Sequence, residues 1–144
     1  MATALSSLAA IEMVRRALLD TSAVAALVGD RVLGAYPEQV DDGQSTYPLV
    51  ALVQRGGSMR RWGRMEDVSF DLLAYSGESP SAAAEVYDAC AAALQAERIT
   101  FADTGATDGE RAAVAEEAGR PGAMWDGGLR KWVQSGRWLI RCIG

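Results

Sequence analysis

Few residues of this chain could carry acid–base or nucleophilic chemistry. The sequence contains no histidine, so catalytic arrangements that use a histidine base do not arise. Three carboxylates, Glu66, Asp67 and Asp71, lie close enough together to suggest paired acid and base groups. Asp67 and Asp71 alternate with apolar residues, however, as on the solvent side of a strand. We therefore interpret them as surface carboxylates and predict that the chain is not an enzyme.

Motifs for metals and phosphate are equally weak. Cys90 and Cys142 lack the histidines or the paired spacing of a zinc site, and we interpret both as small buried apolar residues. The acidic residues within 38–42 do not follow calcium-loop spacing and indicate a solvated loop. The glycine pair Gly56-Gly57 is followed by no lysine, unlike a phosphate-binding loop. The sequence predicts no cofactor and no bound metal.

Charge is unevenly distributed along the chain. Residues 1–65 carry a net charge of +1, residues 66–126 one of −10 and residues 127–144 one of +4, for a total of −5. Basic clusters can contact phosphate, but a dedicated nucleic-acid binder is usually basic overall. We interpret these clusters as balancing the acidic middle, within the fold or across a subunit interface. Segregated charge suits head-to-tail association of identical subunits.

Two aromatic-bearing segments are candidates for contacts between proteins. Residues 55–64 form a glycine-rich segment that we predict to be an extended basic loop. Arginine and tryptophan dominate the energetics of protein interfaces, which makes this loop a candidate interface through Arg55, Arg60, Arg61, Trp62 and Arg64. Trp125 lies in a second glycine-rich stretch and is either a packing anchor or an interface residue.

The elements that position these residues follow from hydrophobic periodicity. Apolar spacing predicts helices over residues 8–19, 23–28 and 80–96. The last is expected to begin at Pro80 with Ser79 as its cap, and its apolar stripe comprises Ala83, Tyr87, Cys90 and Leu94. Alternating or continuous apolar runs predict strands over 31–36, 49–54, 67–75, 99–102 and 129–143, with 112–118 either a strand or a short helix. Gly136, within the last of these strands, is expected to mark a β-bulge. Residues 1–7 are expected to be a flexible arm. The order predicts one α+β domain over 1–144, a mostly antiparallel sheet with two main helices packed on it. There is neither an apolar run of about 20 residues nor a secretory signal, so we expect no membrane association.

The order and spacing of these segments resemble the tail-completion proteins of long-tailed bacteriophages, a family that includes the lambda tail terminator. The resemblance is carried by the leading helix, by two short runs and by three later elements: Leu27-Val28-Gly29-Asp30-Arg31-Val32, Tyr47-Pro48-Leu49-Val50, the strand 67–75, the alanine-rich helix after Pro80 and the strand 138–143. It covers residues 8–143.

The resemblance implies a structural function. Such proteins form a homohexameric ring that ends polymerisation of the tail tube at its head-proximal end and gives the head-completion (stopper) protein a docking surface. The implied partners are other copies of the chain, the tail tube protein and the stopper. Genome DNA would pass through the lumen without specific binding. The implied location is the virion, after assembly in the host cytoplasm, and the family carries no catalytic residues.

Two other functions remain open from the sequence. One is a different head–tail connector component, such as a stopper or a tube protein. The other is a cytoplasmic domain that binds a small-molecule or protein ligand. Self-association separates the ring-forming hypothesis from a ligand-binding domain.

Overall fold

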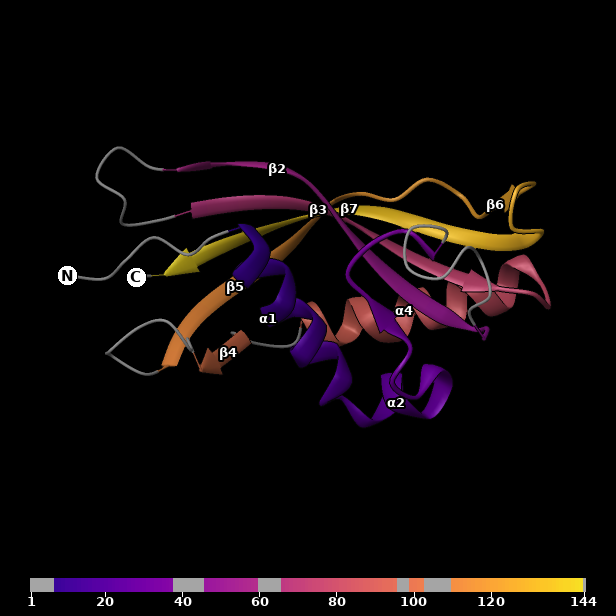
Figure 1. Cartoon of the computed structure of the whole chain (residues 1–144), viewed down its shortest axis with the longest axis horizontal. Coiled ribbons are helices and arrows are strands. Elements are labelled where there is room, and N and C mark those ends of the chain that lie inside the picture. The colour runs from indigo at the N-terminus through magenta and orange to yellow at the C-terminus, as the bar shows by residue number, and fades with distance from the viewer. Residues whose placement is uncertain (1–6, 38–45, 60–65, 96–98, 103–109, 144) are drawn as a thin grey trace.

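The computed structural model describes residues 7–37, 46–59, 66–95, 99–102 and 110–143 (Figure 1). Side chains are described for residues 11–37, 46–55, 68–95 and 115–140. Three helices, α1 (Ser7–Leu19), α2 (Ser22–Val28) and α4 (Pro80–Gln95), pack on one sheet. The predicted α+β architecture is therefore confirmed.

In the described part of the chain the sheet contains seven strands, and all neighbouring pairs but one are antiparallel. In chain order the strands are β1 (Val32–Leu33), β2 (Leu49–Met59), β3 (Glu66–Ser76), β4 (Ile99–Ala102), β5 (Glu110–Gly119), β6 (Met124–Asp126) and β7 (Lys131–Ile143). Their order across the sheet is β1-β2-β3-β7-β5-β4, and β6 pairs with β7 beyond the end of β5. The long strand β7 thus has three partners.

The helices follow the predicted apolar stripes. On α1 the buried residues Ile11, Val14 and Leu18 recur every three or four positions, as an amphipathic helix requires. On α4 the predicted stripe is buried along its whole length: Ala83, Tyr87, Cys90 and Leu94. Helix α2 ends at Gly29, whose φ of 62° is a conformation that glycine adopts at little cost.

Helix α4 also begins as the sequence predicts. The backbone N–H of Ala82 donates a hydrogen bond to the Ser79 hydroxyl at 3.0 Å, which satisfies one of the free donors at the start of the helix. Pro80 occupies the first helical position, where its missing N–H costs nothing.

The main core lies between the helices and one face of the sheet. Alternate residues of β3 point into it, namely Val68, Phe70, Leu72 and Ala74. Trp138 and Ile140 of β7 join them and are fully buried. Because side chains alternate along a strand, the residues between these positions face the opposite side of the sheet.

A second, smaller core covers part of that opposite face. Leu49, Ala51, Leu73 and Tyr75 are buried there, under side chains that include Tyr36 and Leu129. The sequence predicted a mostly solvated side for the strand 67–75. That prediction was wrong for its second half, because segments distant in sequence fold over Leu73 and Tyr75 and remove them from solvent.

The extents of two strands also differ clearly from those predicted. Strand β1 has two residues rather than six. Strand β2 continues to Met59, so the expected loop does not begin at Arg55, because antiparallel pairing with β3 holds Gly56–Met59 in the ladder. Residues 60–65 and the expected arm residues 1–6 lie outside the described residues. Residues 112–118 lie in strand β5.

The irregularity expected at Gly136 is found elsewhere. The register of β3 and β7 runs without a shift through Leu72 and Gly136. Register shifts lie instead in β2, between Gln54 and Gly56, and in β5, between Glu117 and Gly119. Gly136 instead permits a close approach: a methyl group there would overlap the hydroxyl and ring of Tyr87.

Other predictions bear on chemistry and location. Cys90 is buried, and burial raises the pKa of its thiol to about 12, as suits an apolar packing role; the side chain of Cys142 lies outside the described residues. Within the described ranges, no three His, Cys, Asp or Glu side chains are grouped to hold a metal ion. No helix of the described part is long and apolar enough to cross a membrane.

Candidate functional site

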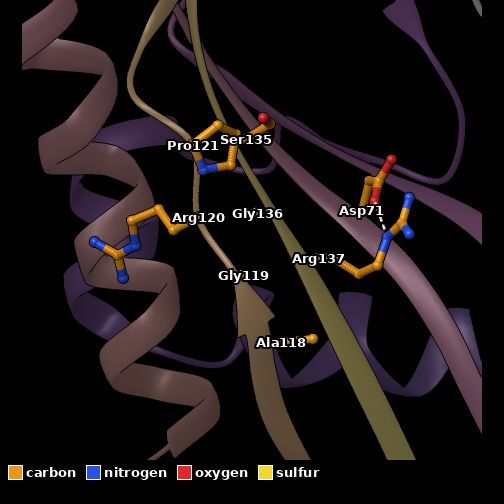
Figure 2. Close-up of a pocket in the computed structure, with 8 residues that line it drawn as sticks. All are labelled: Asp71, Ala118, Gly119, Arg120, Pro121, Ser135, Gly136 and Arg137. Carbon is orange, nitrogen blue, oxygen red and sulfur yellow. Dashed lines mark hydrogen bonds and ion pairs between the residues drawn. The ribbon is translucent and has the colours of Figure 1, made fainter.

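An open pocket of about 550 Å³ lies where β3, β7 and the end of β5 meet (Figure 2). Its lining comprises Asp71, Ala118, Gly119, Arg120, Pro121, Ser135, Gly136 and Arg137. Asp71 and Arg137 are cross-strand partners, and their neighbours Phe70, Leu72 and Trp138 belong to the main core. Their side chains therefore project from the sheet face opposite α4.

Two arginines share the one carboxylate of this pocket. Asp71 accepts hydrogen bonds from Arg55 Nε at 2.5 Å and from Arg137 Nε at 3.5 Å. The Asp71 side chain is only 13% exposed. Its hydrogen bond and charge raise the pKa of Arg55, and Arg55 also donates to the Tyr36 hydroxyl at 2.8 Å. The cluster carries a net charge of +1.

Arg137 is the less satisfied of the two arginines. Its contact with Asp71 is long, and its side chain is 61% exposed. A guanidinium has five N–H donors in a fixed planar fork, and the contact to Asp71 uses one of them. The remaining donors are available to a carboxylate or phosphate brought by another molecule.

Arg120 contributes to the pocket wall, but its side chain extends toward α4 (Figure 2). It donates to Glu117 at 3.0 Å and to Asp88 at 2.6 Å, and its guanidinium lies 4.3 Å from the ring centre of Tyr87. These contacts tie the end of β5 to α4. The pocket is thus built on a fixed edge of the sheet.

A series of hydrogen bonds leads from Glu117 into the core. Trp138 Nε1 donates to the Tyr87 hydroxyl at 2.9 Å, and that hydroxyl donates to Glu117 at 2.7 Å. Burial, followed by the bond to Glu117, raises the pKa of Tyr87 above its ordinary value. Burial alone would raise the pKa of Glu117, but the hydrogen bonds from Tyr87 and Arg120 outweigh it and lower that pKa.

A separate surface lies on β6. This strand is at the opposite end of the sheet from the C-terminal end of β2 (Figure 1). Met124 and Trp125 are 59% and 50% exposed and are the large apolar side chains that the described part of the chain leaves in solvent. Trp125 packs edge-on against Trp132 with ring centres 5.1 Å apart. The packing contact predicted as one alternative is therefore present, and the exposed half of the ring stays a candidate interface.

Residues 12–140 match the protein-family model described as "Tail completion protein gp17". The match spans nearly all of the described elements. This chain belongs to the tail completion protein gp17 family. The resemblance found in the sequence is thereby confirmed, and no curated protein sequence matches the chain.

Membership of the tail completion family establishes a coarse function. The chain is a bacteriophage structural protein of the tail, a virion component that assembles with other tail proteins. Such families are not typically enzymatic. The surfaces described above are therefore candidates for contacts with proteins rather than for binding a substrate.

The predicted interface residues of this tail completion protein have different outcomes. Arg55 is described and bonds to Asp71 and Tyr36, whereas Arg60, Arg61, Trp62 and Arg64 lie outside the described residues. Neither the pairing of Arg137 with Asp71 nor the exposure of Met124 was predicted from the sequence. The pairing of Asp71 with Arg137 depends on register between strands 66 residues apart, for which a single sequence carries no signal.

The contacts of the Glu117 carboxylate with Tyr87 and Arg120 are expected to make the stability of the fold depend on pH. Because the pKa of Glu117 is lowered in the folded state, its contribution to stability is present above the ordinary pKa of 4.5 and is lost as the pH falls through the folded value. Glu117→Gln is expected to cost about 1.5 kcal/mol at pH 7 and less at pH 3, below the ordinary pKa of 4.5. Urea unfolding at both pH values measures this difference. Glu116→Gln, an exposed neighbour, is the matched control, and a cost for Glu117→Gln that is the same at both pH values would contradict the prediction.

Proposed function

We propose that this protein, as a single domain over residues 1–144, forms a homohexameric ring at the head-proximal end of the tail tube. There it ends tail polymerisation and gives the head-completion (stopper) protein a docking surface. The observation that carries this proposal is the family match over residues 12–140. Assembly takes place in the host cytoplasm, before the tail joins the head.

Two surfaces are proposed to make the contacts of this ring. The first is the pair Met124 and Trp125 on β6, because an exposed aromatic beside an apolar neighbour is a common centre of interface energy. The second is the basic segment 55–64, with Arg55, Arg60, Arg61, Trp62 and Arg64. The C-terminal end of β2 and the strand β6 lie at opposite ends of the sheet (Figure 1). One molecule can therefore engage two partners at once.

The charge of the chain supports passage of DNA without retention. The net charge is −5 and the sequence pI is about 4.7. A ring of acidic subunits repels the phosphate backbone on average, which favours sliding over binding. Specific DNA binding is not part of the proposed function.

The proposal is tested by light scattering and negative-stain imaging of the purified protein, alone and with isolated tail tubes. We expect sixfold rings in solution or sixfold caps on one end of the tubes. Tubes incubated without the protein are the control for tube ends. A monomer that leaves tube ends bare would contradict the ring-forming function and favour another connector role.

A further inference from the structure

We propose that the pocket around Arg137 in one copy receives the outward face of helix α4 from a second copy, with Glu85 as the carboxylate that Arg137 binds. The inference rests on the proposed ring and assigns the contact between its subunits. It concerns side chains that the structure describes, and it does not involve residues 55–64 beyond Arg55.

The described residues of the pocket offer the N–H donors of Arg137 one acceptor, the Asp71 carboxylate, at a long distance. Asp71 places one oxygen 2.5 Å from Arg55 and the other 3.5 Å from Arg137. The short contact is to Arg55, so Arg137 keeps most of its donors. An arginine fork binds a carboxylate most strongly when two parallel N–H groups engage it, and a second carboxylate is required to achieve this.

The pocket is also shaped to admit a side chain next to that guanidinium. Its walls include two glycines and one serine, Gly119, Gly136 and Ser135, which project little into the space. Gly136 is fixed as glycine by its contact with Tyr87. A volume of about 550 Å³ holds a glutamate with its neighbouring side chains.

Helix α4 presents the complementary charge on its outer face. Its inner stripe packs on the sheet, and the positions half a turn away are exposed: Ser81, Glu85, Asp88, Ala92 and Gln95. Asp88 is already bound by Arg120. Glu85 is exposed and makes no ion pair with any other side chain of the described residues, so among the described carboxylates of α4 it is the one that we assign to Arg137.

The two surfaces lie on different sides of the molecule, so a copy can use both at once. Arg137 projects from the sheet face opposite α4, and Glu85 projects from the side of α4 opposite the sheet. A heterologous contact joins two different patches on each subunit, and it generates a closed ring when the rotation between neighbouring subunits closes. Repeated from copy to copy, this one contact would join neighbouring subunits, in addition to the contacts proposed for β6 and for residues 55–64.

Charge exchange tests this contact. Arg137→Glu and Glu85→Arg, made separately, are each expected to reduce the fraction of protein in rings at least about tenfold, because like charges then meet. The double variant restores an opposite pair and is expected to recover most of the ring fraction. The matched control is Arg16→Glu, which makes the same charge change at an exposed residue of α1 and is expected to leave rings intact. The measurement is mass by light scattering, or caps per tube end if rings form only on tubes.

Disulfide trapping provides a second readout that does not require closed rings. Arg137→Cys and Glu85→Cys are made in separate proteins that also carry Cys142→Ser, and the two are mixed and oxidised. Cys90 is buried and stays unreactive. We expect a cross-linked dimer from the mixture and not from either protein alone, because only the mixture places the two thiols in one contact.

Each outcome decides between the proposals. Normal rings in both single charge variants would overturn this contact and leave the ring function standing. Loss of rings without recovery in the double variant, together with no cross-link, would also overturn it and assign the pocket to an acidic surface of another tail protein. If the wild-type protein forms neither rings nor caps but the mixture still cross-links, the contact is supported and the ring function fails.

Discussion

Replacing Gly136 with alanine is expected to destabilise the protein by about 3 kcal/mol, near the upper end of the range for overpacked cores. The added methyl group would occupy the position of the Tyr87 hydroxyl and press on its ring. Tyr87 cannot yield easily, because it is fully buried and its hydroxyl is held between Trp138 and Glu117. The substitution therefore breaks a buried polar chain as well as a packing contact.

Thermal and urea unfolding measure this effect, with an expected drop in Tm of roughly 10 °C. Gly122→Ala is the matched control, since a methyl group there meets no atom within 4 Å. Tyr87→Ala is costly by itself, but it removes the atoms that the new methyl group would strike. The double variant should consequently cost clearly less than the sum of the two single changes. Two results would contradict the role assigned to Gly136. One is a double variant whose cost equals the sum of the costs of Gly136→Ala and Tyr87→Ala. The other is equal stability of Gly136→Ala and Gly122→Ala.

Replacing Trp125 with serine is expected to weaken assembly about 30-fold while changing stability little. The side chain is half exposed and lies on a three-residue strand, so its removal costs the fold mainly the edge contact with Trp132. In an interface, however, a tryptophan beside Met124 has the properties of a residue worth about 2 kcal/mol or more, which corresponds to that factor. The binding of labelled protein to tube ends measures it.

Two further variants make the Trp125 result interpretable. Trp125→Phe retains an aromatic surface and is expected to keep most of the affinity. Met124→Ala removes the apolar neighbour and should cause a smaller loss than Trp125→Ser. If all three variants bind tube ends as well as the wild type, β6 does not contact the tube or a neighbouring subunit there.

The helices were the most predictable part of the fold. The stripe Ala83, Tyr87, Cys90 and Leu94 recurs at helical spacing, and Ser79 followed by Pro80 is a local start signal, so neighbouring residues alone determine α4. The same holds for Ile11, Val14 and Leu18 on α1. These elements carry their information within a few residues.

The sequence predicted which segments form strands better than it predicted where those strands end and which of their faces are buried. Gly56 and Gly57 have weak strand preference and suggested a loop, yet both lie in β2 because β3 supplies a full set of pairing partners. Leu73 and Tyr75 were expected at a solvated surface, and the segments around Tyr36 and Leu129 bury them. In each case a partner distant in sequence overrides the local preference.

The candidate site shows the same limit. Trp125 could be selected from its residue type and its setting among glycines, because a large aromatic in an irregular segment requires either packing or a partner. Arg137 could not be selected, since its importance arises from sharing Asp71 with Arg55 across three strands. Gly136 gave a signal, a glycine inside a strand, but the cause was Tyr87 of α4 rather than a bulge.

The central position of β7 has a consequence for how the chain reaches its native state. Strand β7 pairs with β3, β5 and β6, and the pair Asp71 and Arg137 closes a loop of 66 residues. Pairing of such high contact order slows folding, and until β7 arrives, β3 and β5 each present an unpaired edge that can recruit strands from other chains. Protection of newly made chains at this stage, by a chaperone or by low temperature during expression, is therefore expected to increase the yield of soluble protein more than any change to the helices.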